Sequence, residues 1–228
     1  MCRKFWQQTV TTGHCIRKGI TGASTESLPA ICQENARTLA SELAINMEDV
    51  IMTWVSELQS LDTDSEESSI PSISCHTSDF TICLDREQGA VVVTILGTRI
   101  FPAPNIYDIV MDIRAETQPF LDGEAHAGMV IGARNLMSRS WEAVREAVTS
   151  NPGYSILVVG YSLGAGLAQL YTAQLLDNED MRQELPSDTK IRALCYGAPP
   201  VYRTSQDQAV RLYPEIVIIQ NNKDGIIA

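Results

Sequence analysis

The sequence predicts an α/β fold, in which helices cover both faces of a mainly parallel β-sheet. Three observations support this prediction. With 228 residues, 44% of them hydrophobic, the chain can bury a sizeable core. From residue 79 onward, short apolar runs alternate with longer helical patterns. The short runs are apolar at successive positions, which is typical of strands that are buried on both faces.

Charge and hydropathy exclude several classes of function. The chain has 17 basic and 28 acidic residues, for a formal net charge of −11. This balance argues against a nucleic-acid partner, since no excess of basic side chains can neutralise phosphates. No apolar run approaches the ~18 residues of a transmembrane segment, and the amino terminus lacks the apolar core of a secretory signal. We therefore expect a cytoplasmic protein.

The sequence divides at residue 78. Residues 1–28 predict a loose arm, and residues 60–72 predict an acidic, serine-rich linker. Between them, Pro29 opens a pattern of apolar residues at helical spacing, which predicts an N-terminal helix with the stripe Leu39, Leu43, Met47, Val50, Ile51, Trp54, Val55 and Leu58. The stripe favours packing on the core, although packing on another chain would give the same pattern. We expect residues 1–78 to form this arm and helix, and residues 79–228 to form the α/β domain.

The α/β domain opens with two strands and continues with alternating helices and strands. Phe80–Leu84 and Ala90–Leu96 predict strands joined by a turn at Asp85–Gly89. A helical pattern covers about residues 130–149 and is broken by Asn151-Pro152-Gly153. The remaining predicted elements are the strand Ser155–Val159, the helix from Leu163 to about Leu176, and the strands Ile191–Tyr196 and Glu215–Gln220.

The sequence predicts no metal and no organic cofactor. None of the six cysteines is spaced as C-x-x-C, and the G-x-x-x-x-G-K pattern of phosphate-binding loops is absent. Scattered cysteines in a chain of this size favour reduced, buried thiols over disulfides.

The sharpest functional signal is the pattern G-x-S-x-G at Gly160–Gly164. It directly follows an apolar strand and directly opens a helix, which is the setting of a nucleophile elbow. In such a turn the serine, here Ser162, is held in a strained conformation with its hydroxyl exposed, and the flanking glycines avoid a collision. The amino terminus of the helix makes the N–H of Leu163 a natural oxyanion donor. The alternative is a glycine-rich turn with an idle serine.

A serine nucleophile needs a general base, and the base needs an acid to orient it. Asp224 fits the acid, because it follows the apolar strand Glu215–Gln220 at its carboxyl end, where the sites of open α/β sheets gather. An aspartate in a turn before a glycine is the alternative. Where the acid follows the serine along the chain, the histidine comes last. Every histidine here precedes Ser162, at His14, His76 and His126, so the triad is incomplete in this sequence.

A second oxyanion donor should come from the turn after an early strand. Ala90–Leu96 followed by Gly97 and Thr98 fits this expectation, since Thr98 offers both an N–H and a hydroxyl. A bare turn at the end of a strand is the alternative.

From about residue 79 onward the chain resembles the class 3 lipases, which are fungal-lipase-like and diacylglycerol-lipase-like α/β-hydrolases. The resemblance lies in blocks that occur in the family's order: Val92–Arg99, Tyr107–Asp112, Ala125–Met129, Gly160–Gly166, Tyr196–Pro199 and Asn221–Asp224. In the block around Ser162, Tyr161 and Ala165 replace the usual His and Gly.

The resemblance implies an α/β-hydrolase fold with Ser162 as the nucleophile, Asp224 as the acid, and Thr98 and Leu163 as oxyanion donors. It gives His126 a structural position and not that of the base, which in the family lies on a loop well after the acid. The missing base suggests either a chain that ends early or a degenerate enzyme.

We therefore predict a serine carboxylic-ester hydrolase that acts through an acyl-enzyme on acylglycerols or related lipid esters. The expected partners are this substrate and, transiently, a lipid interface. Acyl transfer to an alcohol would use the same residues. The alternative from another class is a catalytically incomplete hydrolase-fold module that serves binding or interaction, which the missing base favours.

Overall fold

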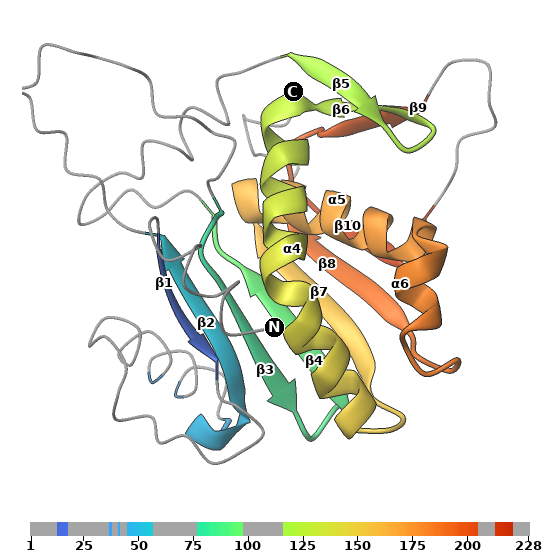
Figure 1. Ribbon diagram of the computed structural model, residues 1–228. Helices are drawn as coiled ribbons and strands as arrows, with labels where there is room; N and C mark the ends of the chain where they lie inside the picture. The colour runs from blue at the N-terminus through green and yellow to red at the C-terminus, as the bar shows by residue number, and fades with distance from the viewer. Residues whose placement is uncertain are drawn as a thin grey trace, which may run out of the picture.

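The computed structural model describes residues 13–17, 37, 41, 45–56, 77–97, 116–204 and 213–220. This part of the chain forms a seven-stranded sheet with the order β1-β2-β3-β4-β7-β8-β10 and a small sheet with the order β5-β6-β9 (Figure 1). The strands are β1 (Gly13–Arg17), β2 (Val50–Ser56), β3 (Phe80–Asp85), β4 (Ala90–Ile95), β5 (Thr117–Phe120), β6 (Gly123–His126), β7 (Ser155–Tyr161), β8 (Ile191–Tyr196), β9 (Tyr202–Thr204) and β10 (Ile216–Ile219). The helices are the short 3-10 helix η2 (Met47–Asp49), α4 (Ala127–Ser150), α5 (Leu163–Asp177) and α6 (Glu179–Gln183).

The large sheet has an antiparallel half and a parallel half. Strands β1 to β4 pair antiparallel, whereas β4, β7, β8 and β10 pair parallel. The parallel half is the part predicted from the continuous apolar runs, and it carries the candidate site. Its register sets Tyr196 beside both Tyr161 and Ile219, so the carboxyl ends of β7, β8 and β10 lie level at one edge.

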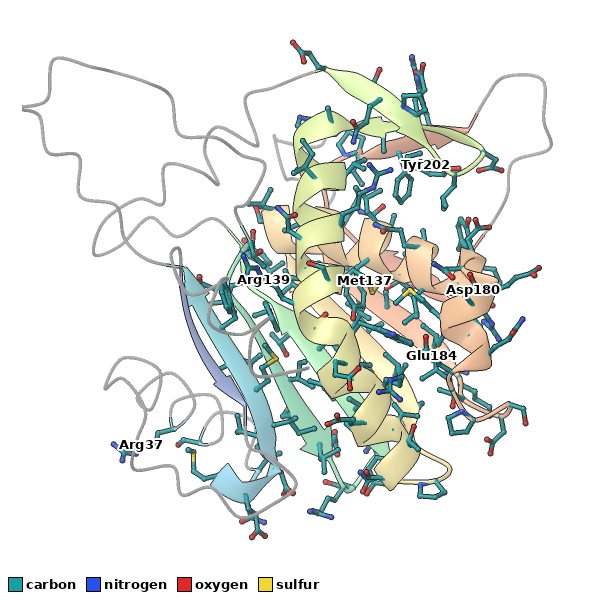
Figure 2. The ribbon with its side chains drawn as sticks, in the orientation of Figure 1. Arg37, Met137, Arg139, Asp180, Glu184 and Tyr202 are labelled. Atoms are coloured by element: carbon teal, nitrogen blue, oxygen red, sulfur yellow. The ribbon has the colours of Figure 1, made fainter. Side chains whose placement is uncertain are left out.

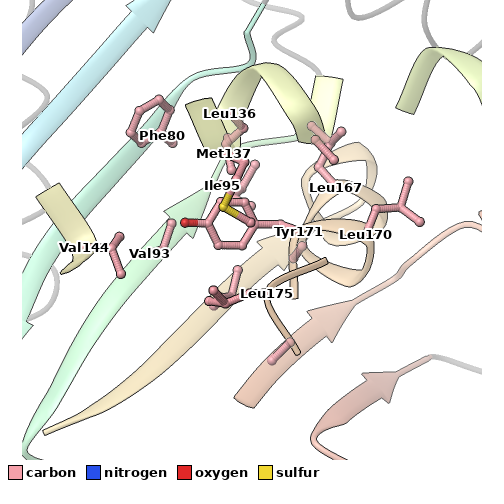
Figure 3. Close-up of a cluster of buried hydrophobic side chains, with 14 of the residues drawn as sticks. Phe80, Val93, Ile95, Leu136, Met137, Val144, Leu167, Leu170, Tyr171 and Leu175 are labelled. Carbon is pink, nitrogen blue, oxygen red and sulfur yellow. The ribbon is translucent and has the colours of Figure 1, made fainter. Parts of the chain in front are cut away.

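One face of the large sheet is covered by α4 and α5. The cluster in Figure 3 lies between these helices and the strands, and includes fully buried residues of β3, β4, α4 and α5. Tyr171 is fully buried in it, and its hydroxyl lies 3.0 Å from Ser140 Oγ of α4. Because the two hydroxyls are paired, their hydrogen bond offsets the cost of burying them between α4 and α5.

The other face of the sheet carries a second, smaller apolar cluster. Cys83, Ala90 and Val92 are buried there, with Ile45, Leu157 and Val159 packed against them. The prediction of an α/β fold with a sheet covered by helices is confirmed. Helices were expected on both faces; among the described residues α4 and α5 cover one face, so helices on the second face stay a prediction. Every strand and helix predicted from residue 79 onward is present, within three residues of its predicted ends.

The prediction of a helix was wrong over residues 50–56, and Glu57 and Leu58 lie outside the described residues. Residues Val50–Ser56 form β2, which pairs antiparallel with both β1 and β3. A short run that is apolar at nearly every position satisfies the period of a buried strand as well as that of a helix, and pairing with β3 decides between them. Arg37 and Ser41 are helical, and the rest of the predicted helix before Ile45 lies outside the described residues. The division at residue 78 stays a prediction. The large sheet contains strands from before this residue, β1 and β2, and strands from after it.

The small sheet was not predicted. Strands β5 and β6 form a hairpin that leads directly into α4, and β9 pairs with β6 (Figure 1). Phe120 and Tyr202 pack edge to face with their ring centroids 5.8 Å apart, and the Tyr202 hydroxyl donates a hydrogen bond to Asp122. These strands have four residues or fewer, and β5 contains Pro119, so neither length nor pattern identified them.

The described part of the chain contains no helix that is long and apolar enough to cross a membrane.

Candidate active site

Ser162 lies in a sharp turn between β7 and α5. Its backbone angles are φ 54° and ψ −123°, in a region that residues with a side chain rarely adopt. The turn is held on both sides: the Ser162 N–H donates to the Tyr196 carbonyl at 2.9 Å, and the Ser162 carbonyl accepts from the N–H of Ala165 at 2.9 Å and of Gly166 at 3.2 Å. This is the strand–turn–helix geometry that the G-x-S-x-G pattern predicts.

The two glycines of the pattern are required by close backbone contacts. A Cβ atom on Gly160 would lie 2.2 Å from the Gly164 carbonyl oxygen, and one on Gly164 would lie 2.3 Å from the Ile95 carbonyl oxygen. Neither position leaves room for a side chain, because both neighbours are backbone atoms. The glycines therefore let α5 begin directly against the ends of β4 and β7.

The turn after β4 lies against the turn that carries Ser162. A Cβ atom on Gly97 would lie 2.7 Å from the Tyr161 carbonyl oxygen and 3.4 Å from Ser162 Cβ. Thr98, the predicted second oxyanion donor, is the next residue along the chain and lies outside the described residues.

Leu163 is the first residue of α5, and its side chain is buried in the core at 2% exposure. The first N–H groups of a helix have no acceptor within the helix and lie at its positive end. The N–H of Leu163 is thus placed beside Ser162 with the polarity that an oxyanion requires.

Asp224 lies outside the described residues, whereas β10, the strand that precedes it, is described. β10 is parallel to β8, and the Ile219 carbonyl accepts from the Gly197 N–H at 2.9 Å. The chain therefore leaves β10 at the same edge of the sheet at which β7 delivers Ser162.

The structure separates His14 from Ser162 and gives His126 a role in capping. β1, which carries His14, is four strands away from β7 in the sheet order, or about 19 Å at the usual strand spacing. His126 is the N-cap of α4, where its Nδ1 accepts from the Met129 N–H at 3.4 Å. His76 lies outside the described residues.

Other nucleophiles and metal sites find no support in the described ranges. Cys195 lies beside Gly160 in the β7–β8 register, but burial raises the pKa of its thiol to about 12, so it stays protonated near neutral pH. No group of three or more His, Cys, Asp or Glu side chains is placed to hold a metal there.

Large apolar side chains flank Ser162 at this edge. Tyr161 is 68% exposed, and Leu96 and Tyr196 are 44% and 40% exposed. Tyr161 and Tyr196 are neighbours in the register of β7 and β8, so they lie on the same face of the sheet.

Comparison with known proteins identifies the family. The family model described as lipase (class 3) matches residues 92–227, which is more than half of the chain. The chain belongs to the class 3 lipase family. The matched range contains Thr98, Ser162, Leu163 and Asp224.

The curated relatives in this family are much longer than this chain. Over 147 residues the chain is 29% identical to diacylglycerol lipase-beta of Mus musculus, covering 58% of this chain and 20% of that protein. Over 127 residues it is 26% identical to a lipase of Rhizopus niveus, covering 55% of this chain and 30% of that one.

Solved lipase structures align with part of the chain. Lipase II from Rhizopus niveus aligns with a TM-score of 0.45 and 21% identity, covering 55% of this chain and 45% of that chain. The native Rhizomucor miehei lipase propeptide complex aligns with a TM-score of 0.47 and 15% identity, covering 74% of this chain and 50% of that chain.

Sequence reasoning singled out Ser162 in this member of the class 3 lipase family but missed the contacts behind it. Met129 Sδ would lie 2.8 Å from a Cβ atom on Gly166, so the amino end of α4 packs directly against the first turn of α5. The only sequence signal was that Gly166 is small, and it did not say which element would fill the space.

Proposed function

We propose that this chain carries the nucleophile of a lipid-ester hydrolase, with Ser162 attacking the acyl carbonyl. The observation that carries the proposal is the backbone of Ser162, a strained non-glycine residue at the amino terminus of α5. Strain of this kind, roughly 1–3 kcal/mol, persists where the surrounding structure holds it, and it is concentrated at functional sites.

The proposed reaction proceeds through an acyl-enzyme. Ser162 Oγ forms a bond to the carbonyl carbon as its proton passes to a general base, and the N–H groups of Leu163 and Thr98 stabilise the oxyanion. The tetrahedral intermediate then expels the alcohol, which takes up the proton. Water hydrolyses the acyl-enzyme by the same steps in the second half of the cycle. Asp224 orients the base, and we assign no base among the described residues.

The proposed substrates are acylglycerols or related lipid esters. The relatives named above are a diacylglycerol lipase and a fungal lipase, which supports this class. The exposed apolar side chains of Leu96, Tyr161 and Tyr196 beside Ser162 would suit an acyl chain better than a charged group. The net charge of −11 favours uncharged lipid esters over anionic ones.

A fluorophosphonate probe tests the nucleophile directly. The 228-residue protein is incubated with the probe, and the modified residue is identified by mass spectrometry. We expect modification at Ser162, none in Ser162→Ala, and unchanged modification in Ser138→Ala, because Ser138 is an exposed serine of α4 that serves as the matched control. Because no histidine follows Asp224 here, added imidazole should accelerate the modification by acting as the base.

A folded protein that is not modified at Ser162, even in imidazole, would contradict the proposal. That result would favour the binding or interaction module. Product analysis with an acylglycerol in the presence of an alcohol separates hydrolysis from acyl transfer.

A further inference from the structure

Two segments that are far apart in the sequence fill the space left by the missing side chain of Gly166. A Cβ atom at Gly166 would lie 2.8 Å from Met129 Sδ, 2.9 Å from Val201 Cγ1 and 3.3 Å from Pro199 Cγ. Met129 belongs to the first turn of α4, and the other two residues belong to the segment between β8 and β9. Met129 and Val201 are each 3% exposed, so this contact is closed to solvent.

His126 makes hydrogen bonds to the backbones of both buried residues. Its backbone N–H donates to the Val201 carbonyl at 2.9 Å, and its side-chain Nδ1 accepts from the Met129 N–H at 3.4 Å. The following residue is also anchored, since the Ala127 N–H donates to the Glu116 carbonyl at 2.8 Å. The His126 side chain thus caps α4, while the His126 backbone holds the segment whose Val201 side chain reaches the same Cβ position of Gly166 as Met129 does.

The contact at Gly166 is directly connected to the turn of Ser162. The N–H groups of Ala165 and Gly166 both donate to the Ser162 carbonyl, so the first turn of α5 cannot shift without moving the serine. Met129 and Val201 therefore pack against the first turn of α5, which holds Ser162 in its strained backbone conformation.

We propose that His126 is a positioning residue for Ser162. Its side chain caps α4 next to Met129, and its backbone N–H binds the Val201 carbonyl; through the cap the side chain holds Met129 against Gly166 and so fixes the first turn of α5. This role rests on the proposed function, because it matters for catalysis only if Ser162 is the nucleophile. It requires Nδ1 to accept a hydrogen bond and therefore to carry no proton.

Amide hydrogen exchange, read by mass spectrometry on the 228-residue protein, tests this role without any requirement for activity. In His126→Ala we expect exchange about fivefold faster in the first turns of both α4 and α5, because the cap is lost. In His126→Asn we expect the native rate in both turns, since a short amide oxygen caps a helix well. If His126→Ala does not fold, His126→Gln replaces it, because the longer amide is not a preferred cap residue.

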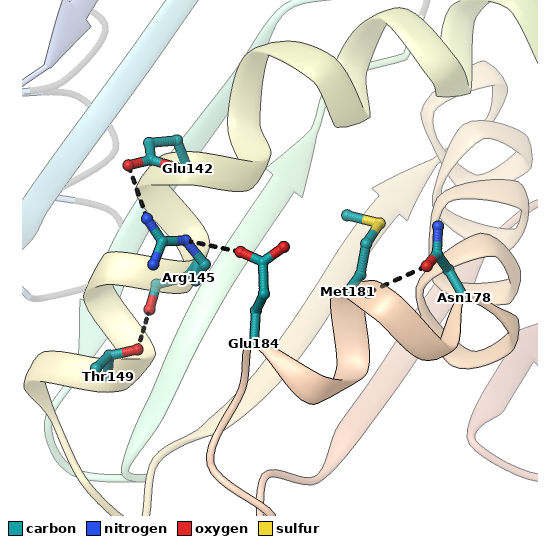
Figure 4. Close-up of polar contacts among 6 residues, drawn as sticks. All are labelled: Glu142, Arg145, Thr149, Asn178, Met181 and Glu184. Carbon is teal, nitrogen blue, oxygen red and sulfur yellow. Dashed lines mark hydrogen bonds and ion pairs between the residues drawn. The ribbon is translucent and has the colours of Figure 1, made fainter. Parts of the chain in front are cut away.

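Asn178→Ala is the matched control. Asn178 caps α6 by accepting from the Met181 N–H at 3.0 Å, a contact shown in Figure 4. The variant loses the same kind of hydrogen bond away from Gly166. We therefore expect faster exchange in α6 and an unchanged exchange rate in the first turn of α5. Equal acceleration of the α5 turn in this control would overturn the proposal.

A double-mutant cycle with Met129→Ala tests the route of the effect. If His126 acts through Met129, the denaturation midpoint of the double variant shifts by less than the sum of the two single shifts. Additive shifts would overturn the proposal, as would a His126→Asn variant that exchanges like His126→Ala. Failure of the fluorophosphonate to modify Ser162 would contradict the proposed function but leave these results unchanged.

Discussion

At the scale of single residues, the site depends on a strained serine and on side chains that are absent. The positive φ of Ser162 is maintained by three backbone hydrogen bonds to Tyr196, Ala165 and Gly166. Those bonds can form only because α5 starts within contact distance of β4 and β7, which the glycines allow. A side chain at one of these glycines should therefore disturb the Ser162 backbone conformation more than a change in the polar groups around it.

Gly160→Ala tests this argument at one position. The new Cβ would lie 2.2 Å from the Gly164 carbonyl oxygen, so the turn must open. We expect loss of Ser162 modification by fluorophosphonate and a lowered melting temperature. Gly153→Ala is the control, because its φ is +85° but nothing lies within 4 Å of its Cβ position. It should cost about 1–2 kcal/mol of stability through backbone strain and leave the modification unchanged. Normal modification of Gly160→Ala would show that the turn tolerates a side chain.

Sequence patterns anticipated some of these residues and missed others for a physical reason. Gly160 and Gly164 are predictable, since their spacing around Ser162 follows from the turn itself. The contacts of Gly97 with Tyr161 and of Gly166 with Met129 depend on how β4 pairs with β7 and where α4 packs. Contacts between segments so far apart in the chain leave no local pattern.

At the scale of elements, β2 shows where local pattern fails. Its apolar run has β-branched residues at Val50, Ile51, Thr53 and Val55, which favour a strand, although the same run also fits a helical stripe. Its place is decided by pairing with β3 and by a contact from α4. In that contact the Arg139 guanidinium lies 4.2 Å from the centre of the Trp54 ring, and Figure 2 shows Arg139 on the side of α4 nearest β2.

Arg139 should therefore stabilise the attachment of β2. Besides stacking on Trp54, its Nε donates to Thr77 Oγ1 at 2.7 Å. We expect Arg139→Ala to lower the free energy of unfolding by about 1–3 kcal/mol, from the cation–π contact and the hydrogen bond together. Urea denaturation measures this change. Arg134→Ala, an exposed arginine of the same helix, should stay within about 0.5 kcal/mol of the parent. Equal losses of unfolding free energy in the two variants would show that Arg139 contributes no more to stability than an exposed arginine.

The contact between α4 and α6 should contribute less than the attachment of β2. Arg145 of α4 lies 3.3 Å from a Glu184 carboxylate oxygen and 2.8 Å from one of Glu142 (Figure 4). The side chains of Arg145 and Glu184 are 30% and 50% exposed, so solvent screens the pair. Exposed pairs of this kind contribute roughly 0–1 kcal/mol, and α6 is held mainly by its cap and by apolar packing.

At the scale of the whole molecule, the level carboxyl ends of the parallel strands explain how a candidate site can be located from strand ends in the sequence. The carboxyl ends of β4, β7, β8 and β10 lie at one edge, so residues such as Gly97 and Ser162 come together although 64 residues lie between them in the sequence. A parallel sheet makes this convergence general, and a motif at one strand end therefore locates the others. No base could be predicted in this way, because every histidine of this sequence precedes Ser162.

Buried thiols and a buried phenol on both faces of this sheet predict its response to alkali. Burial raises the pKa of Cys83 from 9.0 to about 11, that of Cys195 from 9.0 to about 12, and that of Tyr171 from 10.0 to about 12. The folded state then holds protons that the unfolded state releases, so the stability that these groups contribute is fully present below about pH 9 and is lost as the pH rises toward 11–12.

Urea midpoints measured from pH 7.5 to 10.5 test this response. We expect the midpoint to fall above pH 9, and to fall less steeply in Cys83→Ala and Cys195→Ala, because each variant removes one group that titrates on unfolding. Val158→Ala is the control: it removes buried methyl groups from the core near Cys195 and should lower the midpoint at every pH without changing the slope. A midpoint that does not change between pH 8 and pH 10.5, or equal slopes in all four proteins, would mean that these thiols are not shielded in the folded sheet.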